Sequence, residues 1–464
     1  MQKAEEFYKK LVDDNFAESL QSAKKQQEYI KTSTARYHGY FVHTLYMPKM
    51  FTEEMAAYFK KAAESMYKIL EKVIHEYQTN AEYRKLFGFD EKLEKLILRQ
   101  NHYECALPIA RIDIFFNEDD FSFKFCEFNA DGSSAMNEDK ELNQAIRLTS
   151  TFDKFTEKYN VRTYELFNSW VKAFMDIYRT YDRAVENPHI AIVDFFGDDI
   201  SREFTAFQKA FEDSGLTCEI CEITDLSYEN GKLLSPSGKQ INAIYRRAVT
   251  CDIMRNYDKV QPFIKAAENN DVCLIGDFKT QVIHNKIVFK VLHDDMTSAF
   301  LTDEEKQYVK DHIPYTASLT QEEIDKHDVL NTKDKWVIKP EDSYASKGVY
   351  AGVEGMSDHA WKEEVLSNVD NHYLLQEYCT PYATWNIDIT HDENAKYKKY
   401  SNITGMYVYN GKLAGLYSRI AKNSIISTQY SEMSLPTIVV SEKLHTKSTQ
   451  ASRRLACVLF IAIN

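Results

Sequence analysis

Residues 106–130 read ALPIARIDIFFNEDDFSFKFCEFNA, and this stretch decides the fold. Apolar and polar residues alternate in ALPIARIDIFF and again in FSFKFCEFNA, a pattern typical of half-buried strands. The polar segment NEDD between them predicts a turn, so we expect a β-hairpin. Successive side chains of a strand point to opposite faces, so Arg111 and Asp113 share one face of the first strand. Glu127 and Asn129 likewise share one face of the second.

The pairing register decides whether these polar side chains meet. With a three-residue loop at 118–120, Arg111 lies opposite Glu127 and Asp113 lies opposite Phe125. A slip of one residue would separate the pairs. Two carboxylates and an amide oxygen suit a Mg²⁺ ion that also holds substrate phosphates, and an adjacent arginine can neutralise a transferring phosphoryl group. The alternative is a solvated sheet face with a cross-strand Arg–Glu pair.

The composition is that of a soluble globular protein. Of 464 residues, 44% are hydrophobic and 27% are charged, which excludes a disordered or fibrous chain. The net charge of −13 argues against nucleic acid as a partner. Only 14 residues are glycine, and neither GxGxxG nor GxxxxGK[ST] occurs, so glycine-fingerprint nucleotide folds are disfavoured.

Targeting and cysteine patterns indicate a cytoplasmic protein with no membrane partner. The N-terminal segment MQKAEEFYKKLVDDNF has no apolar core, so we do not expect a signal peptide. The apolar stretch at 455–463 is far shorter than the ~20 residues that a membrane helix needs. Cys218 and Cys221 form a CxxC, but strand alternation puts them on opposite faces, so we expect free thiols in a reducing compartment.

Periodicity divides the chain into four parts. Helical spacing dominates residues 1–100 and returns at 138–183, where Leu142, Ile146, Leu166, Trp170 and Phe174 are expected in the core. From residue 187 a strand–helix–strand rhythm predicts a parallel βαβ unit. After 280 we expect a helix over QVIHNKIVFKVLHD, another over TDEEKQYVKDHI, and then six strands. The expected domains are 1–100, 101–185, 186–280 and 281–464.

A second motif is WVIKPEDSYASKGVY at 336–350. A strand ends at Lys339, and a polar loop with Ser343, Ser346, Lys347 and Gly348 follows. A lysine at a strand end can hold a phosphate as a point charge while such a loop closes over it. The alternative is an ordinary surface hairpin.

Weaker signals are spread over the rest of the chain. LLQEYC at 374–379 could offer Gln376, Glu377 and backbone groups to an adenosine, or be an ordinary strand. Lys286 and Arg419 read as surface charges unless something links them to the other motifs. One of the two arginines of IYRRAV (244–249) could bind an acidic substrate. The alternative is an ordinary ion pair within the protein.

The order of these motifs supplies that link. RxD…ExNAD, HNK, VIKP…SKGV, LLQEY and GLYSR resemble the glutathionylspermidine synthase family, the circularly permuted branch of the ATP-grasp ligases, over roughly residues 105–430. The magnesium acids precede the phosphate lysines here, as in that family. The resemblance implies an α/β (α+β) fold: a permuted ATP-grasp with a helical N-terminal region and an inserted parallel α/β unit. With no Cys/His amidase domain ahead of it, we expect a stand-alone ligase.

The resemblance also implies roles for individual residues. It implies ATP and Mg²⁺ as cofactors, with the metal on Asp113, Glu127 and Asn129. Arg111 and Arg419 would be catalytic: Arg111 would stabilise the acyl phosphate and the transition state leading to it, and Arg419 would face the transferred phosphate or the acid substrate. The nucleotide would contact Lys286, Lys339, Ser346, Lys347, Gly348, Gln376, Glu377 and Tyr378.

The implied reaction activates a carboxylate as an acyl phosphate, which an amine then attacks to give an amide. The expected substrates are a peptide or amino-acid carboxylate and a small amine, which the acidic charge allows to be a polyamine. The alternative is an ATP-binding sensor or scaffold of the same fold. A phosphotransferase would need a placed histidine, and His284 beside Lys286 comes nearest. The sequence leaves the oligomeric state open.

Overall fold

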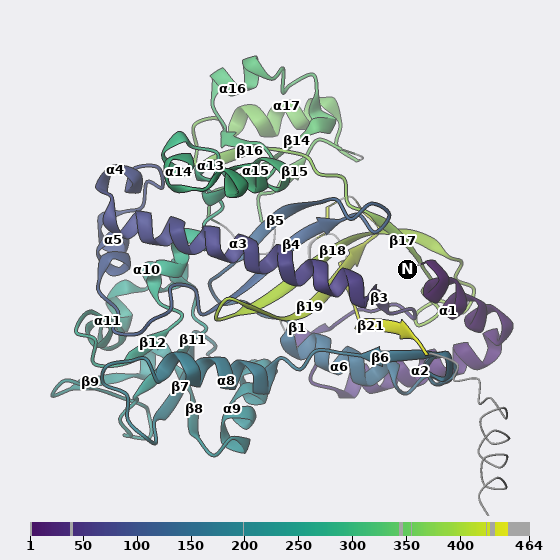
Figure 1. Ribbon diagram of the computed structural model, residues 1–464, viewed down its shortest axis with the longest axis horizontal. Coiled ribbons are helices and arrows are strands. Elements are labelled where there is room, and N and C mark those ends of the chain that lie inside the picture. The colour runs from purple at the N-terminus through teal and green to yellow at the C-terminus, as the bar shows by residue number, and fades with distance from the viewer. Residues whose placement is uncertain are drawn as a thin grey trace, which may run out of the picture.

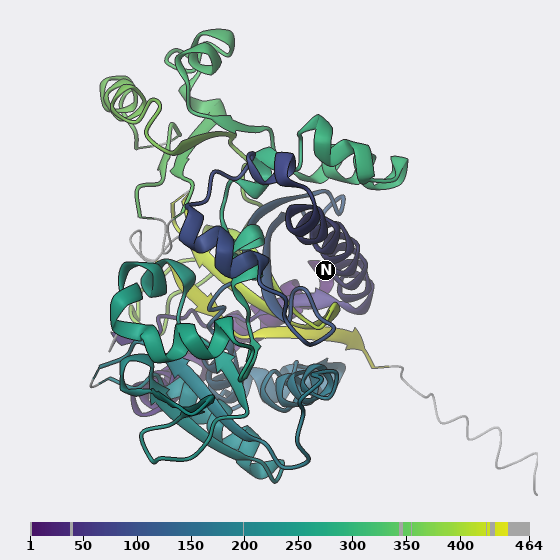
Figure 2. The same ribbon diagram turned by 90° about the vertical axis from the view of Figure 1, so that its left-hand side faces the viewer.

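The computed structural model describes residues 2–37, 40–197, 199–342, 347–353, 355–423, 425–426 and 432–443. Ser346 and the apolar stretch at 455–463 lie outside these ranges. Two views at right angles place a parallel sheet (teal) and a smaller antiparallel unit (green) at opposite ends, with the central sheet between them (Figures 1 and 2). In the described ranges, no helix has the length and apolar character needed to cross a membrane.

The central sheet is antiparallel and runs in the order β20-β19-β18-β4-β5, with β17 also paired to β18. One face is apolar, with Ile112, Phe128, Met406 and Leu416 fully or almost fully buried. The long helix α3 (Glu53–Thr79), which begins at the N-cap Thr52, crosses the sheet in Figure 1 and shares its core. The strands are β4 (Ile109–Phe116), β5 (Phe123–Asn129), β17 (Ala383–Asn386), β18 (Lys398–Tyr409), β19 (Lys412–Ala421) and β20 (Met433–Leu435).

The predicted strand–helix–strand segment forms a four-stranded parallel sheet in the order β12-β11-β7-β8. Phe207 and Tyr245 pack together on the face that α8 and α9 cover. Val193 and Ile244 belong to the core that the central sheet shares. The elements of this unit are α8 (Phe167–Tyr178), β7 (His189–Asp194), α9 (Arg202–Asp213), β8 (Thr217–Glu222), β9 (Ser227–Glu229), β10 (Lys232–Leu234), β11 (Ala243–Arg246), α10 (Thr250–Arg255), α11 (Gln261–Glu268) and β12 (Cys273–Ile275).

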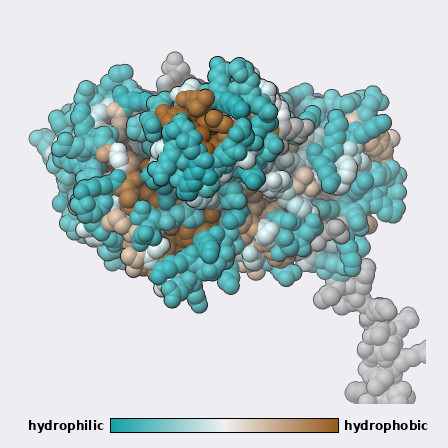
Figure 3. All heavy atoms as spheres, turned by 90° about the horizontal axis from the view of Figure 1, so that it is seen from above, coloured by the Kyte–Doolittle hydropathy of each residue, from teal (hydrophilic) through white to brown (hydrophobic). Residues whose placement is uncertain are grey.

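The smaller antiparallel sheet runs in the order β13-β16-β14-β15. Ile338, Leu375 and Trp361 pack in its own core. Seen from above, the surface is largely hydrophilic, and hydrophobic residues show mainly in recesses (Figure 3). The elements here are α12 (Gln281–His284), α13 (Val288–Val291), α14 (Asp295–Phe300), α15 (Asp303–His312), β13 (Thr316–Ser318), α16 (Gln321–Lys326), β14 (Trp336–Pro340), β15 (Tyr350–Ala351), α17 (Asp358–Ser367) and β16 (Tyr373–Glu377).

The N-terminal region is less purely helical than predicted. β3 pairs in parallel with β21, and β6 pairs with the other side of β21, so the start and the end of the described chain share one small sheet. Such short strands carry too few residues for a period to show. The helices and strands not yet given are α1 (Gln2–Asp14), α2 (Phe16–Thr32), β1 (Arg36–Tyr37), β2 (Tyr40–Phe41), β3 (Lys49–Thr52), α4 (Ala81–Arg84) and α5 (Glu91–Leu98) in the N-terminal region, and α6 (Met136–Ile146), α7 (Ser150–Lys158), β6 (Tyr159–Arg162) and β21 (Thr437–Glu442) beyond it.

The structure decides several local predictions. The five expected core residues of 138–183 are all buried, and Cys218 and Cys221 are free and buried. The single helix predicted over QVIHNKIVFKVLHD is wrong, because α12 ends at His284 and α13 starts at Val288. Neither arginine of IYRRAV is open to a substrate. Arg246 pairs with Asp131 at 2.7 Å and Arg247 pairs with Glu203 at 2.8 Å.

Candidate functional site

The hairpin of β4 and β5 has a different register from the predicted one. Arg111 lies opposite Asn129 and Asp113 lies opposite Glu127, so the predicted pairing is wrong by two residues. One residue of the shift comes from the turn, which spans 117–122. The other comes from a β-bulge at Cys126, where the register shifts between Asp113 and Ile114. Because two single slips restore the strand parity, the four polar residues still share one face.

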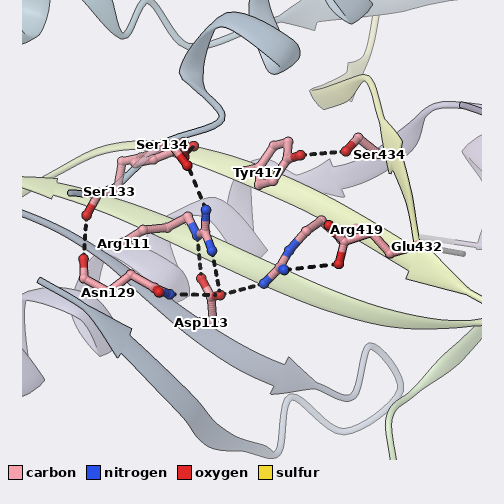
Figure 4. Close-up of polar contacts among 10 residues, drawn as sticks. Arg111, Asp113, Asn129, Ser133, Ser134, Tyr417, Arg419, Glu432 and Ser434 are labelled. Atoms are coloured by element: carbon pink, nitrogen blue, oxygen red, sulfur yellow. Dashed lines mark hydrogen bonds and ion pairs between the residues drawn. The ribbon is translucent and has the colours of Figure 1, made fainter. Parts of the chain in front are cut away.

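Asp113 is the centre of this face. Its carboxylate is fully buried and accepts two hydrogen bonds from Arg111, from Nε at 2.8 Å and from Nη2 at 3.1 Å. Asn129 Nδ2 donates to Asp113 Oδ2 at 3.2 Å, and Arg419 Nη2 donates to the same oxygen at 2.6 Å. Figure 4 shows Arg111 and Arg419 reaching Asp113 from different strands of the central sheet. The two arginines that the sequence placed 308 positions apart therefore meet on one carboxylate.

Gly405 makes room for this arrangement. It lies on β18 directly opposite Asp113, and Tyr417 follows opposite Gly405 on β19. A Cβ at position 405 would lie 2.8 Å from Arg111 Cδ and 2.9 Å from Asp113 Oδ1. Arg419 belongs to the next row of the sheet, opposite Ile403, so it reaches Asp113 across the gap that the glycine leaves. A glycine inside a strand is a known sign of such close approach.

Arg419 and Arg111 each have a second anchor. Arg419 Nη1 donates to Glu432 Oε2 at 3.2 Å, and both side chains are about seven-eighths buried. Arg111 Nη1 donates to the backbone carbonyl of Ser134 at 3.1 Å, and its guanidinium lies 5.7 Å from the centre of the Tyr417 ring. No sequence motif pointed to Glu432, because it lies outside all of them.

Glu127, the second carboxylate of the site, lies beside two lysines, Lys286 and Lys339. Lys286 Nζ forms an ion pair with Glu127 Oε1 at 2.9 Å, and the Lys286 backbone N–H donates to the carbonyl of Glu341, one residue beyond β14. The break between α12 and α13 places Lys286 in this position. Burial raises the pKa of Glu127, but Lys286, Lys339 and His284 lower it, and the net shift is strongly downward. Glu127 is therefore a carboxylate at any physiological pH.

Lys339 is a buried cation that has no bonded anion among the residues that the structure describes. Its residue is 6% exposed. In the described part of the chain its ammonium makes no hydrogen bond or ion pair within bonding distance, and its nearest recorded partner is the Phe289 ring, 5.0 Å away. Burial lowers the pKa of Lys339, and Lys286 lowers it too, although Cys126 and Glu127 act in the opposite direction. A desolvated ammonium with no bonded partner is costly, which indicates a place for an anion.

The residues predicted around the adenosine lie on β16 and after β14. Gln376 pairs with Val337, so it shares the face of Lys339, but its Nε2 already donates to Thr316 Oγ1 at 2.8 Å. Glu377 pairs with Trp336 and so belongs to the opposite face. The backbone N–H groups of Glu377 and Tyr378 donate within the sheet, to the carbonyls of Tyr315 and Lys335.

The start of the loop after Lys339 is only partly described. Lys347 is exposed, and Gly348 has φ +73°, a conformation that favours glycine. A Cβ at Gly348 would also lie 2.7 Å from the Tyr373 hydroxyl, so the turn packs against β16.

The donor set on the hairpin suits a magnesium ion chemically. In the parts of the chain that are described, no group of three or more His, Cys, Asp or Glu side chains is arranged to hold a metal. A site here therefore depends on Asn129 as the third ligand beside Asp113 and Glu127. Asn129 uses its Nδ2 toward Asp113, which leaves its Oδ1 for a hard cation.

A separate cavity of about 750 Å³ lies at the carboxyl ends of β7 and β8. It shares no residue with the site on the central sheet. Its lining includes Phe196, Ile200, Ile220 and Glu222.

Comparisons with known proteins report on the fold. No protein-family model and no curated protein matches the sequence. Among solved structures, a glutathione synthetase-like effector from Globodera pallida in its apo form has a TM-score of 0.59 at 10% identity, over 90% of this chain and 96% of that one. A putative gamma-glutamylcysteine synthetase from Methylobacillus flagellatus has a TM-score of 0.38 at 10% identity, over 82% and 86%. The latter value is too low to define a shared fold. The chain therefore has the fold of a glutathione synthetase-like protein.

Proposed function

We propose that this protein is an ATP- and Mg²⁺-dependent carboxylate–amine ligase that works through an acyl phosphate. The observation that carries the proposal is the buried ammonium of Lys339. It has no bonded anion in the described ranges of the chain, and the carboxylate of Glu127 is already neutralised by Lys286. A phosphate group would supply the missing partner, because charge-assisted hydrogen bonds to phosphate are among the strongest that a lysine makes.

The charge balance of the site agrees with a polyphosphate ligand. Four cations, Arg111, Arg419, Lys286 and Lys339, surround the carboxylates of Asp113, Glu127 and Glu432. Adding a divalent metal to this set would leave a clear excess of positive charge. A nucleotide triphosphate with its metal restores the balance. We therefore place the phosphates between Lys286 and Lys339.

The rest of the nucleotide is assigned by the resemblance. The loop of Ser346, Lys347 and Gly348 would cover the phosphates. Gln376 would face the base from the Lys339 side of β16, and Glu377 with Tyr378 would line the pocket at the end of that strand. Since the amides of Glu377 and Tyr378 are already bonded, the base would have to use other backbone groups there.

The metal would be held by Glu127, Asn129 and Asp113. When bound, Mg²⁺ would supply positive charge that neutralises the transferred phosphoryl group. Arg111, fixed by Asp113 and the Ser134 carbonyl, would stabilise the acyl phosphate. Arg419 would face the acid substrate.

The chain's own residues would act by position and charge. Cys126 projects from the bulge into the same region, but burial raises its pKa to about 12, so it is a neutral thiol and a poor nucleophile. Orientation and electrostatic stabilisation suffice for a reaction in which the substrate carboxylate attacks ATP and an amine then attacks the acyl phosphate.

The finer assignment follows the sequence. The motif order supports a permuted ATP-grasp of the glutathionylspermidine synthase type, because β5 precedes β14 in the chain and yet carries Glu127, whose pKa Lys339 of β14 helps to lower. The proposed substrates are a peptide or amino-acid carboxylate and a small amine, with polyamines among the candidates.

The test is ADP release by the purified protein. Mg-ATP is supplied with pools of amino acids, glutathione and polyamines, using the wild type and the Lys339→Met variant. Lys335→Met is the matched control, because Lys335 is an exposed lysine just before the same strand. We expect ADP release that requires one acid and one amine, is lost in Lys339→Met and is kept in Lys335→Met. Tight ATP binding without turnover in any pool would instead indicate a nucleotide-binding sensor or scaffold.

A further inference from the structure

We propose that Arg419 and the metal compete for Asp113, so that metal binding releases Arg419 toward the reacting groups. The inference rests on the proposed function for the identity of the metal. Its basis is the arrangement around the carboxylate of Asp113. Arg419 occupies the position next to Asp113 Oδ2 that Mg²⁺ would need, so Arg419 must leave before the metal can bind there.

The Asp113 oxygen that faces Asn129, Oδ2, has no free lone pair. An ionised carboxylate offers about four lone-pair sites, two on each oxygen. Oδ2 accepts from Arg111 Nη2, Asn129 Nδ2 and Arg419 Nη2 at 2.6–3.2 Å, whereas Oδ1 accepts from Arg111 Nε alone and lies on the side of Gly405. No part of the side chain is exposed. A metal that Asn129 also binds therefore reaches Oδ2 only if one of these donors leaves.

Of the two arginines that bind Asp113, Arg419 leaves at the smaller loss, and its positive charge is repelled by a metal, unlike the neutral amide of Asn129. Arg111 makes two bonds to Asp113 and a third to the Ser134 carbonyl. Arg419 makes a single bond to Asp113, and in the described part of the chain its buried Nε has no hydrogen-bond partner. Loss of one bond also leaves Arg419 tethered, because its Nη1 remains on Glu432 at 3.2 Å.

The exchange links two events that the reaction needs together. Before metal binds, Arg419 pairs with Asp113 beside Arg111, so the positive charge of the buried Arg419 is held on two carboxylates. After metal binds, Arg419 keeps Glu432 as its anchor and its second NH₂ group is free for an anion on the same face of the sheet. Glu432 is then a positioning residue, since it acts on the reaction only through Arg419.

The experiment measures Mn²⁺ binding by electron paramagnetic resonance, which detects free Mn²⁺ and needs neither ATP nor substrates. The proteins are wild type, Arg419→Gln, Glu432→Gln and the double variant. Removing a charge-assisted competitor should tighten Mn²⁺ binding about tenfold or more in Arg419→Gln. Glu432→Gln should weaken binding about threefold in the wild-type background, because the displaced arginine loses its anchor.

The double variant separates exchange from simple electrostatics. If Glu432 acts only through Arg419, Glu432→Gln has no further effect once Arg419 is glutamine. A through-space field would give the same weakening in both backgrounds and would overturn the exchange. Equal Mn²⁺ affinity in wild type and Arg419→Gln would overturn the exchange as well. That result would not decide whether the protein is a ligase, which the ADP assay tests separately.

A ligand variant identifies the bound ion. Glu127→Gln removes a proposed metal ligand and should lower Mn²⁺ affinity in both the wild-type and the Arg419→Gln backgrounds. If Arg419→Gln tightened a site that Glu127→Gln does not weaken, the ion would lie elsewhere and the exchange would be refuted. Absence of Mn²⁺ binding in every protein would refute it too.

Discussion

Replacing Gly405 with alanine should damage the site from the strand beside it. The new Cβ would lie 2.8 Å from Arg111 Cδ, 2.9 Å from Asp113 Oδ1 and 3.0 Å from Arg111 Cγ. Neither neighbour is a flexible chain end. Asp113 is fully buried with four donors on its oxygens, and Arg111 is fixed by three hydrogen bonds. The strand or these side chains must therefore shift.

The expected loss follows from two contributions. Overpacking a closed interior costs about 1–3 kcal/mol. A shift that breaks one hydrogen bond between charged groups adds about 1.5–3 kcal/mol. Alanine gains back only about 0.5–1 kcal/mol over glycine within a strand. We therefore expect Gly405→Ala to lower the free energy of unfolding by at least about 1 kcal/mol and to reduce ATP-dependent turnover. Urea unfolding followed by tryptophan fluorescence and the ADP assay measure the two effects.

Gly88→Ala serves as the comparison. Gly88 has φ +65° and nothing within 4 Å of a Cβ, so alanine there meets only the backbone penalty of about 1–2 kcal/mol and lies away from the site. It should lower stability without changing turnover per folded molecule. If Gly405→Ala kept the stability and the turnover of the wild type, the reasoning would be refuted. A methyl group at position 405 would then fit beside Arg111 and Asp113 without displacing them.

Three further predictions concern buried charges and thiols. Burial lowers the pKa of Lys339, so its ammonium should lose its proton at a lower pH than an ordinary lysine. The ATP affinity of the wild type should therefore fall before the pH reaches the ordinary lysine pKa of about 10.4, and Lys339→Met should lack that fall in a titration by calorimetry. Asp131→Ala should lower stability by about 3–5 kcal/mol, because it leaves the buried Arg246 without its carboxylate; an unchanged thermal unfolding midpoint would contradict this. The raised pKa of Cys126 should keep it unreactive toward a disulfide reagent at pH near 8 in the folded protein, so that wild type and Cys126→Ser release equal amounts of reporter, and a difference of one thiol would count against it.

The sequence was sufficient for the elements that repeat a clear period. Alternation in ALPIARIDIFF and FSFKFCEFNA located β4 and β5, and the rhythm from residue 187 located the parallel sheet. The face shared by Asp113 and Glu127 was also predicted correctly. The register was not, because a bulge at Cys126 adds one residue and alternation alone carries no mark of it.

Long-range contacts account for what the sequence did not reveal. Arg419 reaches Asp113 because Gly405 leaves a gap, and the strand-interior glycine in SNITGMYVY was a signal that could have been used. Lys286 meets Glu127 only because the chain breaks between α12 and α13, where apolar spacing favoured one continuous helix. Glu432 has no periodic or motif context, so only the fold brings it to Arg419.

Lys339 is proposed to bind the phosphates of a nucleotide, and this binding can be measured directly. The most direct measurement is the equilibrium affinity for ATP, by calorimetry in the presence of Mg²⁺, of wild type, Lys339→Met and Lys335→Met. We expect that Lys335→Met binds ATP as the wild type does and that Lys339→Met binds it at least about tenfold more weakly. Equal affinity in all three proteins, or no ATP binding by the wild type, would contradict the account.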